Sequence, residues 1–273
     1  EFEAAYDEVV DKQELTLDYD ARRLERLLGL IRSDRRRPFF AHVHLLWTHG
    51  PSFYSPNPVF SEKGQQQEPF ERDFYDDAIL DADGVLAKIA EALASSKQLD
   101  RTIVVLSSDH GRQWGSGRIP LIFWFPGGAH AGRIRTNAQN LDVAPTLLDY
   151  LGIPKPEWME GVSLLAGDPP AERPVFNTAA NSGVVDFETG LVDSSRSKPP
   201  FYSLGRLTAT IANRTFALDL NTGNVATGVV AGHTQPLGEG QGPSLAEARE
   251  ILFRHLEASG YALPASWRKA AKP

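Results

Sequence analysis

The sequence predicts an α/β fold in which a mostly parallel sheet is flanked by helices and followed by a small C-terminal α+β subdomain. Short apolar runs that are typical of buried strands alternate with stretches of helical periodicity, and this order is typical of α/β sheets. Towards the end the pattern changes to short β-like pieces separated by turn residues. We therefore expect an N-terminal acidic segment with a helix, the α/β core and the subdomain, over residues 1–37, 38–173 and 174–273 respectively.

In the first half, the first helix is expected over residues 20–31, where leucine and isoleucine recur at helical spacing and Asp20 stands at the N-cap position. The largely apolar residues 38–47 predict a buried strand. A second helix is expected over residues 74–93, because its apolar side chains fall on one face. That face consists of Ile79, Leu86, Ile89 and Leu93.

The β-branched run over residues 102–106 predicts a central strand, and residues 120–125 predict another that ends at Pro126. Asp142 and Gly152 stand where an N-cap and a C-terminal stop signal would enclose the next helix. Its core side would consist of Leu147, Leu148 and Leu151. In the subdomain we expect two strands and a final helix, over residues 207–211, 215–220 and 244–259.

Composition excludes several classes of protein. The chain of 273 residues is 41% hydrophobic, which is enough for a full core. A net charge of -7 argues against nucleic acid as a partner, and the short basic run Arg35, Arg36 and Arg37 does not change that. With no cysteine there is neither a disulfide nor a thiolate nucleophile. No apolar stretch is long enough to span a membrane and no signal segment opens the chain, whose first residue, Glu1, suggests processing or a piece of a longer protein.

Candidate chemistry lies where two of the predicted strands end, because ligands of open α/β sheets bind at the carboxyl ends of the strands. Asp109 and His110 follow residues 102–106, and His49 follows residues 38–47. A carboxylate beside an imidazole offers one oxygen and one nitrogen ligand, which suit Zn²⁺ or Mn²⁺ and less often Ca²⁺. A catalytic metal usually takes at least three protein ligands, and an Asp-His pair at a strand end, taken alone, is more often a capping and hydrogen-bonding device.

The segment from Ser107 to Gly111 resembles the metal-binding SDHG or SDNG segment of the sulfatase family of the alkaline phosphatase superfamily. Further segments resemble that family in the expected order between about Pro38 and Leu165. These are Pro38-Phe39-Phe40 through His49-Gly50-Pro51, Tyr75 through Asp83 and Gly84, Ile119-Pro120-Leu121-Ile122, Leu141-Asp142-Val143-Ala144-Pro145-Thr146, Leu151-Gly152-Ile153-Pro154 and Glu160-Gly161-Val162-Ser163-Leu164.

The resemblance implies an alkaline phosphatase-like fold, incomplete here, and metal-dependent hydrolysis or transfer of sulfate or phosphate esters. It implies that Asp109 and His110 bind a divalent metal, Ca²⁺, Mn²⁺ or Zn²⁺, and that His49 contacts the anionic ester. It favours a periplasmic or other extracytoplasmic location and leaves room for membrane anchoring through a missing N-terminal part. Asp142 and Thr146 are interpreted as structural, since a helix cap explains them.

Two departures from the family pattern keep an alternative open. The family's nucleophile and further metal carboxylates lie upstream, whereas this chain has no cysteine for a formylglycine and no Ser or Thr in a matching motif, so no catalytic nucleophile is expected in it. The loop after Gly111 is short, and Arg112 is the candidate that replaces the family's substrate-binding cation, with Arg118 as a second choice. The protein is therefore expected to be either a metal-dependent sulfatase, phosphatase or phosphotransferase whose nucleophile lies outside these residues, or a catalytically inactive sulfatase-like binding or regulatory domain of a membrane-anchored protein.

Overall fold

The computed structural model describes residues 19–33, 38–61, 65–112, 118–186, 191–230 and 242–269. These residues form two compact units. The first contains residues 19–104, Arg112 and Phe123–Ala129, and the second contains Val105–Gly111, 118–122 and 130–269. The division into domains after residues 37 and 173 stays a prediction. The basic run from Arg35 to Arg37 lies outside the described residues.

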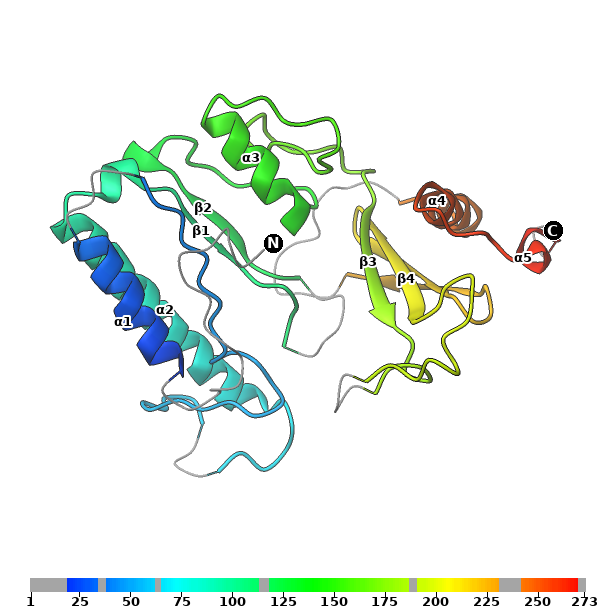
Figure 1. Cartoon of the computed structure of the whole chain (residues 1–273), viewed down its shortest axis with the longest axis horizontal. Coiled ribbons are helices and arrows are strands. Elements are labelled where there is room, and N and C mark those ends of the chain that lie inside the picture. The colour runs from blue at the N-terminus through cyan, green and yellow to red at the C-terminus, as the bar shows by residue number, and fades with distance from the viewer. Residues whose placement is uncertain are drawn as a thin grey trace. The chain divides into compact units, whose positions relative to one another are not determined.

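Two helices dominate the first unit. Helix α1 (Tyr19–Arg32) and helix α2 (Arg72–Ser95) confirm the two predicted helices and pack side by side (Figure 1). The buried face of α2 differs from the predicted one, because Ile79 is 45% exposed while Ala78 and Val85 are buried. The shared core consists of Leu24, Leu28, Ile31, Val85, Ala92 and Leu93.

The prediction of a strand over residues 38–47 is wrong, because residues 38–46 form no strand and Trp47 lies in a turn. A strand needs a partner for its backbone hydrogen bonds, and here the last residues of the segment bond to a side chain. The N–H groups of Leu46 and Trp47 donate to Asp20 Oδ2 at 2.6 and 2.7 Å. Asp20 therefore anchors this extended segment against α1 and is not the helix cap that the sequence predicted.

Strands β1 (Val104–Ser107) and β2 (Leu121–Trp124) confirm two of the predicted strands and form a two-stranded sheet. The short 3₁₀ turns η3 (Leu99–Arg101) and η4 (Pro126–Gly128) flank this pair in the sequence. The first strand delivers the chain to Asp109 and His110, which form a bend immediately after it.

Helix α3 (Val143–Tyr150) follows the 3₁₀ turn η5 (Asn140–Asp142) and confirms another predicted helix. Gly152, with a φ of +67°, ends it as predicted, and the N–H of Ile153 donates to the Leu148 carbonyl. Leu151 is 59% exposed, so the predicted core side is only partly buried.

The C-terminal part of the second unit is an antiparallel sheet in the order β3-β4-β5-β6. Its strands are β3 (Val175–Ala180), β4 (Leu204–Ile211), β5 (Arg214–Asp219) and β6 (Val225–Val229). The middle two confirm the predicted strands, and the outer two had been expected only as unspecified β-like pieces. Helix α4 (Leu245–Ala258) lies beside this sheet (Figure 1), and α5 (Ala265–Lys269) follows it.

The core of this sheet and α4 is the largest of the chain's hydrophobic clusters in the described residues. Phe216, Leu218 and Leu252 are completely buried at its centre. Alternate residues of β4 and β5 supply one side, as the two-residue period of a strand requires. In the described part of the chain, no helix is both long and apolar enough to cross a membrane.

Candidate metal and anion site

The two predicted metal ligands lie next to each other with their side chains directed to a common region. Asp109 Oδ1 and His110 Nε2 are 3.9 Å apart, and the side chains are 65% and 22% exposed. Since bonds from Zn²⁺ to carboxylate oxygen and imidazole nitrogen are about 2.1 Å long, one ion could reach both atoms. The N–H of His110 also donates to Asp109 Oδ1 at 3.0 Å, which holds the carboxylate close to the ring.

The orientation of the imidazole suits a metal ligand. His110 Nδ1 lies 2.8 Å from the Gly111 carbonyl oxygen, which can only accept a hydrogen bond. Nδ1 is therefore assigned as the hydrogen-bond donor, which leaves Nε2, the atom that lies nearer Asp109, as the nitrogen that could bind a metal. Metal-binding histidines are commonly held in this way, by a carbonyl on the nitrogen that does not bind the metal.

The donor set is nevertheless incomplete. Among the residues that the structure describes, no group of three His, Asp or Glu side chains could hold a metal ion. Asp109 and His110 fit a divalent metal as part of a site, with one hard oxygen and one imidazole nitrogen. A complete site needs at least one further ligand from elsewhere.

A side-chain amide from the turn before α3 holds the end of β1. Ser107 Oγ donates to Asn140 Oδ1 at 2.6 Å, and Asn140 Nδ2 donates to the Ser108 carbonyl at 2.8 Å. Ser108 Oγ in turn donates to the His110 carbonyl at 2.6 Å. Asn140 could not be predicted from the sequence, because no sequence pattern links two positions more than thirty residues apart.

The predicted anion-binding residue His49 lies in a turn whose path depends on a glycine. The N–H of His49 donates to the Leu46 carbonyl at 2.8 Å. A Cβ at Gly50 would lie 2.2 Å from Cε1 of Phe70, so only glycine fits between this turn and the ring. The N–H of Phe70 donates to the Pro51 carbonyl at 2.8 Å and closes the contact.

The second predicted anion-binding residue, Arg112, lies over an aromatic ring of the same unit. Its guanidinium carbon is 5.9 Å from the centroid of the Tyr75 ring, within the range of a cation–π interaction. The pKa of the Tyr75 hydroxyl is raised, because the effect of burial is larger than the opposing effect of the nearby Arg112 charge. Tyr75 also contacts Phe53, at 5.0 Å between centroids, and Phe53 contacts Phe70 at 6.4 Å. Ring contacts thus connect the surroundings of His49 and Arg112.

The four predicted site residues are divided between the two units. The structure brings together Asp109 and His110 in the second unit, and relates His49 to Arg112 through packed rings in the first. Arg118, the alternative cation, belongs to the second unit, and residues 113–117 of the shortened loop lie outside the described residues.

The most completely buried carboxylates of the described residues are structural. Asp77 Oδ1 accepts from the N–H groups of Val59 and Phe60, and its Oδ2 accepts from the N–H and hydroxyl of Ser61. Asp142 occupies the predicted N-cap position of α3, but its side chain does not cap that helix. Its oxygens accept from the N–H groups of Gln139 and Val162 and from the guanidinium of Arg173.

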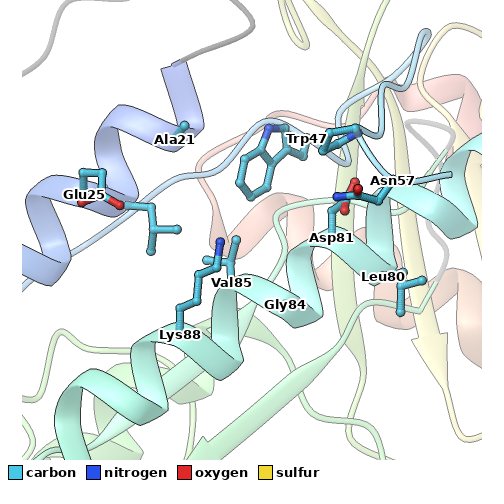
Figure 2. A pocket seen from close by; sticks show the side chains of 11 residues that line it. Ala21, Glu25, Trp47, Asn57, Leu80, Asp81, Gly84, Val85 and Lys88 are labelled. Carbon is cyan, nitrogen blue, oxygen red and sulfur yellow. The ribbon is translucent and has the colours of Figure 1, made fainter. Parts of the chain in front are cut away.

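A cavity of about 370 Å³ lies between α1, α2 and the segment after Trp47. Figure 2 shows the side chains of Glu25, Trp47, Asp81 and Lys88 around it. None of the four predicted site residues lines this cavity. The cavity is therefore separate from the candidate metal and anion-binding residues.

Comparison with known proteins identifies the family. The Sulfatase family model matches residues 1–153, more than half of the chain. The chain therefore belongs to the sulfatase family. Human arylsulfatase K is 38% identical over 108 residues, which cover 34% of this chain and 20% of the relative. The multifunctional alkaline phosphatase superfamily protein PehA of Trinickia caryophylli is 34% identical over 102 residues, covering 32% of this chain and 20% of that protein.

The chain is also similar to a solved structure from Bacteroides thetaiotaomicron that is described as a sulfatase. The match covers 93% of this chain and 67% of that protein, with a TM-score of 0.59 and 16% identity. At this identity the likeness concerns the fold. The predicted α/β fold of the alkaline phosphatase type is thereby confirmed. The chain spans about a fifth of the length of the curated relatives that it matches.

Proposed function

We propose that the protein takes part in metal-dependent hydrolysis or transfer of sulfate or phosphate esters, with Asp109 and His110 as ligands of a divalent metal. The observation that carries this proposal is the pairing of Asp109 Oδ1 with His110 Nε2 at 3.9 Å, with the other ring nitrogen held by a carbonyl. Membership of the sulfatase family supports it. Ca²⁺, Mn²⁺ and Zn²⁺ are the candidate ions.

In this proposal the metal, when bound, stabilises negative charge on the ester oxygens and on the attacking group. Asp109 offsets the metal charge, and His110 offers Nε2 because Gly111 holds the proton on Nδ1. His49 and Arg112 bind the anionic ester group, Arg112 through its permanent charge. The nucleophile comes from polypeptide outside these residues, since the chain has no cysteine and no matching Ser or Thr motif.

The test is turnover of nitrophenyl sulfate and nitrophenyl phosphate by the longest natural polypeptide that contains these residues, with each of the three metals in turn. Asp109→Ala is expected to reduce kcat/KM about 100-fold or more, because a metal contributes several kcal/mol to the transition state. Asp83→Ala, which alters an exposed aspartate of α2, is the matched control and should leave kcat/KM unchanged. Absence of turnover with every metal would exclude hydrolysis of these two ester classes.

A catalytically inactive binding or regulatory domain is the second candidate. Its support is that only two metal-ligating side chains come together among the described residues. This candidate predicts that the anionic esters bind and remain intact. Equilibrium binding of nitrophenyl sulfate without turnover, weakened by Arg112→Ala, would favour it over the enzyme.

A further inference from the structure

We infer that Asn140 is a positioning residue for the Asp109–His110 pair, an inference that rests on the proposed metal site. Asp109 is exposed and His110 is half-buried, and both lie in a bend after β1, so regular secondary structure does not fix them. The two residues before them, Ser107 and Ser108, are held by hydrogen bonds to the side-chain amide of Asn140.

The distances show that Asn140 is the main partner of the Ser107 hydroxyl. That hydroxyl has three acceptors within reach: Asn140 Oδ1 at 2.6 Å, the Pro120 carbonyl at 3.2 Å and the Ser108 carbonyl at 3.4 Å. Hydrogen bonds between hydroxyl and oxygen are usually 2.7–2.8 Å long, so the two carbonyls are second choices. The donor hydrogen therefore points to Asn140.

The amide of Asn140 is used at both ends, which fixes its direction. Oδ1 accepts from Ser107, while Nδ2 donates to the Ser108 carbonyl. The two anchored groups belong to the residues immediately before Asp109, and Ser108 also bonds to the His110 carbonyl through its hydroxyl. A rotation of the Asp109 or His110 backbone would therefore strain these bonds, and the 3.9 Å separation of the two ligand atoms is maintained through them.

The inference is tested by titrating Mn²⁺ alone into the longest natural polypeptide that contains these residues and recording the paramagnetic broadening of the histidine ring signals by NMR. The signal of His110 is assigned with His110→Ala. Asn140→Ala is expected to raise the Kd for Mn²⁺ about tenfold or more, the scale on which residues behind a metal ligand act. Ser107→Ala, which removes one of the two bonds, should raise the Kd by a smaller factor, and Ser107→Thr, which keeps a hydroxyl, should retain the natural Kd.

The matched control is Asn137→Ala. Asn137 is an asparagine of the same connecting segment, and its Nδ2 donates to the Ala212 carbonyl at 2.9 Å, not to the residues around Asp109. A purely structural effect would weaken Mn²⁺ binding equally in both asparagine variants. The inference fails if Asn140→Ala binds Mn²⁺ like the unaltered chain, or if Asn137→Ala loses as much affinity, and in both cases the proposed function stands. If Mn²⁺ fails to broaden His110 in the unaltered chain, both fail together.

Discussion

Asp77 is a buried acid whose function is to hold a loop in place. Its two oxygens accept four hydrogen bonds from residues 59–61, at distances between 2.6 and 3.0 Å. The side chain thus supplies hydrogen-bond acceptors to three consecutive backbone N–H groups of the loop, as a neighbouring strand supplies them in a sheet. Position alone did not reveal this, since Asp76 and Asp77 are adjacent in a helix and only one of them faces the loop.

Asp77→Ala is expected to lower the free energy of unfolding by about 1–3 kcal/mol, because backbone donors lose a buried acceptor. Asp76→Ala serves as the control. The Asp76 carboxylate lies 3.5 Å from Arg72 Nε on the helix surface, and such exposed pairs contribute less than about 0.5 kcal/mol. Urea unfolding monitored by tryptophan fluorescence measures both, and equal losses would contradict the assigned function of Asp77.

The same carboxylate makes stability depend on acid. Burial acts to raise the pKa of Asp77, but the hydrogen bonds from Ser61, Phe60 and Val59 outweigh it and lower the pKa from 3.8 to about 2. A pKa that is lower in the folded state means stability that is present above pH 3.8 and is lost as the pH falls through about 2. Asp77→Asn should therefore show a shallower loss of stability in this interval.

At the scale of elements, local sequence patterns predicted those helices and strands whose formation depends mainly on nearby residues. Helices α2 and α4 and strands β1 and β2 were found where periodicity and β-branched runs placed them. The strand over residues 38–47 was not, because its apolar composition says nothing about a partner, and Asp20 takes the hydrogen bonds of its last residues. The tether by Asn140 was equally invisible, since it joins residues that are distant in sequence.

The start of α4 offers a prediction at this scale. Ser244 Oγ accepts from the N–H of Glu247, and the Glu247 carboxylate accepts from the N–H of Ser244, which together form a capping box. Ser244→Ala is expected to cost about 1 kcal/mol of stability. Hydrogen exchange at the amide of Glu247 should accelerate, whereas Ser259→Ala at the other end should leave that amide protected. Unchanged exchange in Ser244→Ala would show that the cap does not stabilise the helix.

At the scale of the whole molecule, the alternation of strand and helix patterns predicted the α/β class, and the family match and the solved fold agree with it. The metal-binding role of Asp109 and His110 stays a prediction, with Oδ1 and Nε2 of the two side chains 3.9 Å apart and a ring orientation that suits a metal. The further ligands and the nucleophile that the proposed function requires could not be predicted, since neither the sequence motifs nor the described residues contain them.

In the second unit, the buried carboxylate of Asp142 connects three segments of the chain through an ion pair and backbone hydrogen bonds. Asp142 is fully buried and receives the Arg173 guanidinium through two bonds, at 2.8 and 2.6 Å, as well as the N–H groups of Gln139 and Val162. Arg173→Met leaves that carboxylate without its cation and is expected to cost about 3–5 kcal/mol.

The control for this pair is Arg196→Met, since Arg196 and Asp193 form an exposed pair at 3.2 Å. Its loss is expected to cost at most about 1 kcal/mol. Thermal unfolding followed by circular dichroism compares the two variants. Similar melting temperatures for both would contradict a central contribution of the buried pair.

The glycine beside His49 has a consequence for how this turn can vary. Because the Phe70 ring fills the space where a side chain of residue 50 would lie, a larger residue at position 50 would require the ring to move. Libraries that randomise position 50 should therefore recover mainly glycine.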